Sequence, residues 1–262
     1  MTDTASTLWL SAHPTDQSLN GALRDAGVAH LSRDHAVVTS DLYAMGWQAA
    51  LTERDLGDAV GEVVSGTFGA RTREAHLNGT LSPDIRAEQD KLRAADLLVL
   101  QFPLWWAGMP AILKGWVDRV FVNGFAFNVT NAAGRTLKYG EGGLEGKRAL
   151  VVVTAGDREF SFAAGGVNGH LEALLFPLLH GILWYTGIQP LRPHLIAATD
   201  RRDFAGLAAE RDRLLARLDG LPGEAPIDYR TLRHGGYDRD QRLRTDAAPL
   251  DLGIHECTAV PA

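Results

Sequence analysis

The sequence predicts a parallel α/β sheet with helices on both of its faces. Residues 97–102 and 148–154 are continuously apolar, as strands buried on both faces are. Three weaker apolar runs, at residues 7–11, 37–40 and 189–198, bring the number of expected strands to five. Segments with helical spacing separate these runs, and such alternation indicates a parallel sheet.

The helices follow from periodicity and from their start signals. Residues 18–31 place Leu19, Leu23, Ala26 and His30 at helical spacing, which predicts the first helix. Ser82, Pro83 and Asp84 then form a helix start, with serine as the N-cap and proline in the first turn, and this helix runs to about Ala95.

Three further helices complete the pattern. One opens at Pro110 and runs to about Val122. Residues 171–187 predict a buried helix, bent near Pro177 because proline lacks the N–H that a helix interior needs. Residues 203–218 predict a charged amphipathic helix.

The remaining segments lack a clear period. Residues 43–80 predict an irregular insertion, and the glycine-rich residues 134–146 predict a loop. Two prolines place the fifth strand at a sheet edge. We therefore expect a catalytic domain over residues 1–220. Residues 221–262 are rich in proline and charge, and form either a disordered tail or an arm on the core or on a partner subunit.

Composition excludes several classes of function. The 262 residues carry a net charge of −6, which argues against nucleic acid as the main partner. The single cysteine, Cys257, cannot form an internal disulfide. The histidines lack metal-binding spacing, and no GxSxG motif supports a serine hydrolase. Without a signal peptide or a membrane-length apolar run, we expect a cytoplasmic protein that does not enter membranes.

Ligands of open α/β sheets bind at the carboxyl ends of the strands, so three loops matter. The loop over residues 11–20 is rich in hydroxyl and amide groups and leads into a helix N-terminus, where a phosphate is well held. The same residues also fit a capped helix with a solvated polar loop. In the loop over residues 101–110, Trp105 and Trp106 indicate a flat apolar ligand or a subunit contact, unless both rings pack on the core.

The third loop follows the second strongly apolar strand. Thr154, Ala155, Gly156 and Asp157 are mostly small, so the backbone can approach a ligand and offer N–H groups to developing negative charge. An ordinary strand-to-helix turn would have the same composition. Together, the three loops describe a phosphate cradle, an aromatic wall and a donor-rich turn, which suits a flavin.

Several motifs in order resemble the NAD(P)H:quinone oxidoreductases, the DT-diaphorase-like flavoproteins. The strongest are QFPL at 101–104, GMPAILKGW at 108–116 and DRVF at 118–121. Further similar segments are DLYAM at 41–45, LSPDI at 81–85, GVNG at 166–169 and GIL at 181–183. The resemblance runs from about residue 5 to about residue 220. The tail, with GGY at 235–237 and GIH at 253–255, is more similar to bacterial members.

The resemblance implies a flavodoxin-like, doubly wound, five-stranded parallel sheet and non-covalent FAD. It also implies a homodimer with each active site at the subunit interface, and a ping-pong reaction. In that reaction NADH or NADPH reduces the flavin by hydride transfer to N5, and a quinone then takes the hydride. The sequence does not choose between NADH and NADPH.

The resemblance also carries roles onto residues. The FAD diphosphate region would be held by His13, Ser18, Leu19 and Asn20. The flavin ring would be walled by Pro103, Leu104, Trp105 and Trp106. The polar edge of the ring would contact Thr154, Ala155, Gly156 and Asp157. Trp106, Phe127 and Tyr185 would contact the substrate, and Gly156, Phe162 and Asn168 would take part in catalysis.

The sequence departs from the animal enzymes inside the third loop. Phe162 and Asn168 stand where those enzymes have a tyrosine and a histidine, and Phe127 and Val129 stand where they have two tyrosines. Phe162 has no hydroxyl, and Asn168 can donate a hydrogen bond but cannot titrate. We therefore expect a less polar substrate pocket, in which Asn168 hydrogen-bonds the flavin edge or the acceptor.

Other functions fit parts of the same pattern. One alternative is a flavin reductase recruited to another aromatic acceptor in a biosynthetic pathway. Two others are a regulatory subunit bound to a membrane transporter and a structural homologue that has lost the flavin. An ordered arm would be needed for the dimer or for FAD, so deleting residues 225–262 would weaken one or the other.

Overall fold

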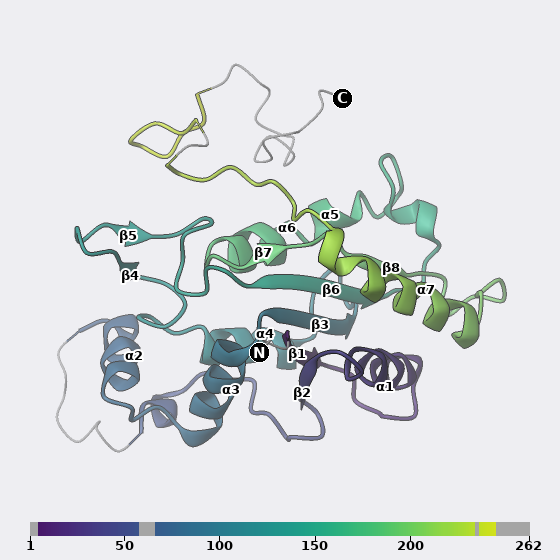
Figure 1. Cartoon of the computed structure of the whole chain (residues 1–262), viewed down its shortest axis with the longest axis horizontal. Helices are drawn as coiled ribbons and strands as arrows, with labels where there is room; N and C mark the ends of the chain where they lie inside the picture. The colour runs from purple at the N-terminus through teal and green to yellow at the C-terminus, as the bar shows by residue number, and fades with distance from the viewer. Residues whose placement is uncertain (1–4, 58–65, 234–235, 245–262) are drawn as a thin grey trace.

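The structure, a computed structural model, describes residues 5–57, 66–233 and 236–244, and its centre is a parallel sheet (Figure 1). The strand order is β2-β1-β3-β6-β7, with β8 also paired to β6, and every pair is parallel. The strands are β1 (Ser6–Ser11), β2 (Ala36–Asp41), β3 (Leu97–Pro103), β6 (Arg148–Thr154), β7 (Gln189–Pro190) and β8 (His194–Ile196). The predicted fold class is confirmed.

The strand order reverses between β1 and β3. From β1 the chain moves outward to β2, then returns to the other side of β1 as β3 and continues to β6. The register pairs Ser11 with Gln101 and Pro103 with Thr154, so these strands end at one edge. The three loops selected from the sequence therefore meet at the switch point, where open α/β sheets bind ligands.

Helices cover both faces of the sheet. Helices α1 (Leu19–Leu31) and α7 (Leu207–Gly220) pack together on one face, where they bury Trp9, Val99 and Val152. Helices α3 (Pro83–Ala94) and α4 (Ala111–Val120) lie on the opposite face over alternate strand residues such as Leu8, Leu10 and Leu98. This alternation is what a strand buried on both faces requires.

The buried helix predicted over residues 171–187 is interrupted as expected near Pro177. It consists of α5 (Leu171–Leu174), α6 (Phe176–Leu178) and the π-helical segment η4 (Leu179–Trp184). Pro177 lies in the first turn of α6, where its missing N–H costs nothing. The predicted bend is confirmed.

Three segments differ from the prediction. The region 43–80 contains η1 (Glu53–Leu56) and α2 (Phe68–Leu77), and α2 gives little apolar signal because only Thr72 and Ala75 are buried. The expected loop around residue 134 contributes to a small antiparallel hairpin of β4 (Val129–Thr130) and β5 (Thr136–Leu137). The fifth strand lies at a sheet edge as predicted, but it is split into β7 and β8, because its prolines cannot donate ladder hydrogen bonds.

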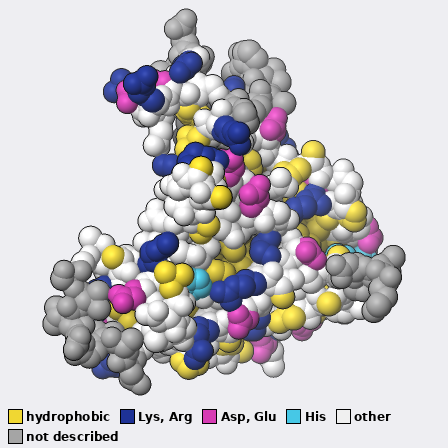
Figure 2. All heavy atoms as spheres, turned by 60° about the vertical axis from the view of Figure 1, so that its left-hand side comes forward, with side chains coloured by type: hydrophobic (Ala, Val, Ile, Leu, Met, Phe, Trp, Pro, Cys, Tyr) yellow, Lys and Arg dark blue, Asp and Glu magenta, His cyan; other side chains and the backbone are white. Residues whose placement is uncertain are grey.

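The last helix begins later than the sequence pattern indicates. Gly206, with φ of 90°, occupies the N-cap position of α7, and Asp203 instead pairs with Arg158 at 3.0 Å. Two short 3₁₀ segments complete the chain: η3 (Glu159–Phe162) precedes α5, and η5 (Leu221–Gly223) directly follows α7. On the face shown in Figure 2, basic and acidic side chains are interspersed.

The first part of the predicted arm belongs to the core. Ile227 and Tyr229 are buried, and the Ile227 N–H donates to the Pro190 carbonyl at 2.8 Å. Trp184 Nε1 donates to the Arg230 carbonyl at 3.2 Å. Cys257 and the GIH motif lie outside the described residues. In the part of the chain that the structure describes, no helix has both the length and the apolar character to span a membrane.

Candidate active-site crevice

Two adjoining hollows lie at the carboxyl edge of the sheet. The larger, which we call the cradle, has a volume of about 380 Å³, and the smaller, which we call the slot, has a volume of about 250 Å³. Leu104, Ala155 and Gly156 line both hollows and so form the wall between them. The cradle is also lined by His13, Leu19, Asn20, Pro103, Trp105, Thr154, Thr199, Asp200 and Phe204, and the slot by Ala107, Asp157, Phe162, Asn168 and Leu174.

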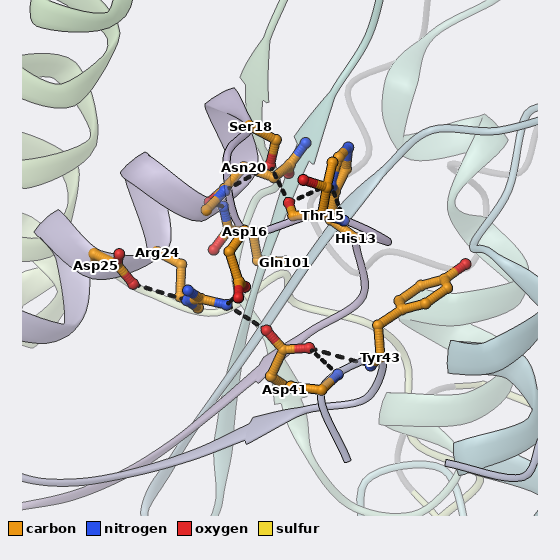
Figure 3. Close-up of polar contacts among 12 residues, drawn as sticks. His13, Thr15, Asp16, Ser18, Asn20, Arg24, Asp25, Asp41, Tyr43 and Gln101 are labelled. Atoms are coloured by element: carbon orange, nitrogen blue, oxygen red, sulfur yellow. Dashed lines mark hydrogen bonds and ion pairs between the residues drawn. The ribbon is translucent and has the colours of Figure 1, made fainter. Parts of the chain in front are cut away.

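The loop after β1 is held in shape by its own polar groups (Figure 3). Ser18 caps α1: its Oγ accepts from the Gly21 N–H at 3.0 Å and donates to the Thr15 carbonyl at 2.8 Å. His13 Nδ1 lies 2.9 Å from the Thr15 carbonyl oxygen. Ser18 is thus a capping residue that lines neither hollow, whereas His13 lines the cradle.

Two residues that line the cradle carry unpartnered polar groups. Among the described residues, the backbone N–H groups of Leu19 and Asn20 have no hydrogen-bond partner, as is usual for the first turn of a helix. Asn20 Nδ2 donates to Thr154 Oγ1 at 2.9 Å, and Gln101 Nε2 donates to the Asn20 carbonyl at 2.8 Å. Asn20 Oδ1 is buried and has no partner. A buried acceptor left unpaired is costly, so this atom favours a ligand that donates to it.

Arg24 ties this loop to the end of β2 (Figure 3). Its guanidinium contacts Asp25 at 2.9 Å and Asp16 at 3.2 Å, and it also pairs with Asp41. Asp41 Oδ1 in turn accepts from the Tyr43 and Ala44 N–H groups at 3.1 and 3.0 Å. Because three carboxylates surround Arg24, an anion in the cradle would be held by backbone N–H groups and not by this cation.

The loop after β3 forms a tight turn. Trp105 and Gly108 exchange backbone hydrogen bonds at 3.1 and 3.0 Å, and Trp106 and Ala107 have φ of 51° and 58°. Left-handed backbone costs a non-glycine residue about 1–2 kcal/mol. Trp105 is 43% exposed and lines the cradle, while Trp106 is fully exposed and lines neither hollow. The alternative that both tryptophan rings pack in the core is therefore wrong.

The loops after β6 and β8 are joined by backbone hydrogen bonds. Thr199 N donates to the Ala155 carbonyl at 3.1 Å, and Ala198 N donates to the Asp157 carbonyl at 2.7 Å. This pairing brings Thr199, Asp200 and Phe204 into the cradle, where the sequence reasoning did not place them. Because β8 ends at the same edge as its neighbours, the loop that follows it could have been predicted to line the crevice.

A side chain at residue 156 would fill the wall between the hollows. A Cβ there would lie 2.5 Å from Asp200 Oδ2, so glycine permits the close approach of these two loops. The Gly156 N–H has no partner among the described residues. The backbone at this position therefore offers a free donor where both hollows meet.

The slot contains Phe162 and Asn168, the two positions at which the sequence is expected to differ from the animal enzymes. Phe162 is buried, and its ring gives the slot an apolar wall. Asn168 Nδ2 donates to Asp157 Oδ2 at 3.1 Å, and Arg201 pairs with Asp157 Oδ1. The hydrogen bonds from Arg201 and Asn168 hold the pKa of Asp157 below its ordinary value.

Two expected substrate contacts lie elsewhere in the chain. Neither Phe127 nor Tyr185 is among the described residues that line the crevice. The Phe127 carbonyl accepts from the Gly124 N–H at 2.8 Å, and the Tyr185 ring packs edge-on against Tyr139 at 5.1 Å. Over the described ranges, no group of three or more His, Cys, Asp or Glu side chains is arranged to hold a metal ion.

The comparisons with known proteins agree with this geometry. The family model described as a flavodoxin-like fold matches residues 5–218. A human ribosyldihydronicotinamide dehydrogenase [quinone] is 39% identical over 86% of this chain and 95% of its own length. A rat NAD(P)H dehydrogenase [quinone] 1 is 38% identical over 83% of this chain and 78% of its own.

A solved structure extends the likeness to the arm. A Klebsiella pneumoniae protein described as a candidate quinone reductase superposes with a TM-score of 0.87 and 41% identity. The superposition covers 96% of this chain and 99% of that protein, so it includes residues of the arm. The chain therefore belongs to the flavodoxin-like fold family and, within it, to the NAD(P)H:quinone oxidoreductases, a family of oxidoreductase enzymes.

Proposed function

We propose that the protein is an FAD-dependent NAD(P)H:quinone oxidoreductase that works by a ping-pong reaction. The observation that supports this most directly is the two-part crevice. The cradle has unpaired backbone donors and a buried unpaired acceptor, and the slot joined to it has an apolar wall at Phe162. A ligand with a polar phosphorylated part and a planar ring would satisfy both parts at once.

The cradle is suited to a diphosphate. The free Leu19 and Asn20 N–H groups at the N-terminus of α1 would meet an oxyanion, because the helix dipole adds a partial positive charge there. Asn20 Oδ1 would accept from a hydroxyl group. The cradle is also lined by Asp200 and Phe204, and the choice of FAD over FMN rests on the resemblance to the quinone oxidoreductases.

The residues around the slot would prepare it for hydride transfer. When bound, the flavin would supply an atom that takes up a hydride from NAD(P)H and releases it to a quinone. The free Gly156 N–H would stabilise negative charge at the polar edge of the ring. Phe162 would exclude water, and Leu104 and Gly156 would set the depth of the ring. Since both substrates would stack on the same face of the ring at the slot, they would bind in turn.

A second copy of the chain would complete the site. Trp106 is fully exposed beside the crevice, and Phe127 and Tyr185 lie outside the crevice of their own chain. In a homodimer, the partner would bury Trp106 and bring its own aromatic residues over the slot. Sedimentation should then give a dimer, and a Tyr185→Ala chain paired with wild type should lose substrate binding at only one of the two sites.

The identity of the cofactor is tested on the purified protein. Heat release of the bound flavin, followed by chromatography and mass measurement, should yield FAD at one per chain. Release of FMN would contradict the assignment of the cradle, and a colourless protein that does not bind added FAD would contradict the function. Activity with NADH, NADPH and dihydronicotinamide riboside would then identify the electron donor.

A second function is favoured by the apolar character of the slot. Phe162 is buried in its wall, and Asn168 lines it at a position where the family resemblance implies a histidine in the animal enzymes. A flavin reductase acting on another aromatic acceptor would have these features. Rapid reduction by NAD(P)H with slow reoxidation by several quinones would select this alternative.

A further inference from the structure

Three side chains at the rim of the slot form a chain of contacts. Arg201 pairs with one carboxylate oxygen of Asp157, and the other oxygen accepts from Asn168 Nδ2 at 3.1 Å. Asp157 and Asn168 both line the slot, whereas Arg201 lies behind Asp157 and lines neither hollow. The three residues come from the loop after β6, the glycine-rich loop that follows it and the loop after β8.

The carboxylate determines which way the Asn168 amide points. An ionised carboxylate only accepts hydrogen bonds, so the amide nitrogen, and not the oxygen, must face Asp157. The backbone of Asn168 is fixed as well, because its N–H donates to the Ser161 carbonyl at 3.0 Å. Asn168 Oδ1 has no hydrogen-bond partner among the described residues. An acceptor and the second N–H of the amide remain available side by side.

Arg201 keeps this arrangement in place. The Ala198 N–H donates to the Asp157 carbonyl, and Arg201 N donates to the Ala198 carbonyl at 3.0 Å, so the backbone sets the pair next to each other. Arg201 is also the main reason that the pKa of Asp157 is lowered. Asp157 therefore stays ionised at neutral pH, and the orientation of Asn168 does not depend on a titration there.

We propose that Asn168, held by Asp157 and Arg201, recognises the carboxamide of the reduced nicotinamide. That group has one carbonyl oxygen and an NH₂, so it matches an amide that offers an N–H and a carbonyl oxygen together. A quinone has only acceptor oxygens and cannot use Asn168 Oδ1. Asp157 and Arg201 are positioning residues. The inference depends on the proposed function, because the donor ring must lie against the flavin beside Asn168.

The test compares two dihydropyridines that carry only the ring. They are 1-benzyl-1,4-dihydronicotinamide and 1-benzyl-3-acetyl-1,4-dihydropyridine, in which a methyl group replaces the NH₂. Their oxidised forms are titrated into the holoprotein by flavin absorbance, which gives dissociation constants without turnover. We expect the carboxamide to bind about 3- to 10-fold more tightly than the acetyl compound, the range for one neutral hydrogen bond.

Variants assign that preference to the three residues. Asp157→Ala and Asn168→Ala should each reduce the ratio of dissociation constants to near one, and the double variant should show no further change, because both remove the same interaction. Arg201→Lys should restore most of what Arg201→Ala loses. The matched control is Asp203→Ala, which breaks the exposed Arg158–Asp203 pair and should keep the wild-type ratio.

The outcomes separate this inference from the proposed function. Equal binding of the two compounds by wild type would overturn the inference, as would an unchanged ratio of dissociation constants in Asp157→Ala. Reduction of the flavin by the dihydro forms would still uphold the proposed function. If Asp157→Ala also slows reoxidation by benzoquinone to the same degree, the pair has a general structural role and the inference is wrong. If no dihydro compound reduces the flavin, both fail.

Discussion

The crevice and the aromatic cluster under the arm are built on opposite principles. The crevice keeps groups unpaired: free N–H groups at Leu19 and Gly156, a buried acceptor on Asn20 and an exposed ring at Trp106. In the cluster, rings meet rings. Phe176 stacks on His180 at 4.6 Å, His180 meets Tyr229 at 5.0 Å, and Tyr139 meets Tyr185 at 5.1 Å.

The cluster therefore contributes mainly to stability, and the crevice mainly to ligand binding. Buried, well-paired rings stabilise the fold, so their loss should be seen in unfolding experiments. Unpaired polar groups contribute little to stability until a ligand pairs them. Substitutions in the cluster should therefore lower stability more than flavin content, and substitutions in the crevice should do the reverse.

The largest effect should come from the cluster. Tyr229 is 3% exposed and belongs to the arm, so Tyr229→Ala should lower the free energy of unfolding by about 3–5 kcal/mol, the range for a buried aromatic residue. Urea unfolding measures this, with the exposed Leu77→Ala as the control. Flavin bound per folded chain should stay the same; loss of flavin without loss of stability would reverse the comparison.

Acid should lower the stability of the fold through His194, a buried residue of β8. Burial, with help from Arg213 and Arg217, lowers the pKa of this histidine to about 4. The unfolded chain takes up the proton near the ordinary pKa, so the stabilising contribution is complete above about pH 6.5 and is lost as pH falls toward 4. The loss should reach about 3 kcal/mol.

A variant isolates that contribution. His194→Leu should flatten the fall in unfolding free energy between pH 6.5 and pH 4, whereas the exposed His170→Leu should leave it unchanged. The measurement is urea unfolding across this pH range. An equally steep fall in His194→Leu would show that other groups are responsible.

In the crevice, Gly21→Ala should separate flavin binding from stability. A Cβ at this position would lie 2.0 Å from the Asp16 carbonyl oxygen, so the loop after β1 must move. Such overpacking costs about 1–3 kcal/mol, less than the cluster variant, yet most of the bound flavin should be lost. Gly220→Ala has open space around its new methyl group and serves as the control. Full retention of flavin in Gly21→Ala would show that this loop does not hold the flavin.

The smallest effect should have the opposite sign. Trp106→Gly relieves a left-handed backbone at φ of 51° and removes no buried contact within the chain, so it should raise stability by up to about 1 kcal/mol. Quinone reduction should fall in the same variant. A loss of stability at high dilution of the protein would show that Trp106 supports the fold of a single chain.

The sequence predicts the crevice better than the cluster for physical reasons. Parallel strands end at one edge, so a loop after an apolar run such as residues 97–102 must face its neighbours. Eleven of the residues that line the cradle and the slot follow from that rule. Thr199 obeys it too, but the prolines of the last strand weaken its signal.

Other features leave no periodic trace. The contact of Arg201 with Asp157 joins residues 44 positions apart, and nothing in either neighbourhood marks it. Helix α2 buries only Thr72 and Ala75, so it lacks the apolar stripe that reveals a helix. The burial of Tyr229 depends on how the arm lies across η4, which the proline- and charge-rich composition of the tail conceals.

Anaerobic stopped-flow absorbance tests the central claim most directly. The purified holoprotein is mixed with NADH, NADPH or dihydronicotinamide riboside until the flavin is reduced, and then with benzoquinone in a second mixing. We expect rapid bleaching by at least one donor, followed by rapid reoxidation at a rate that rises with quinone concentration. A flavin that no nicotinamide donor bleaches, or that benzoquinone leaves reduced, would contradict a quinone oxidoreductase built on this crevice.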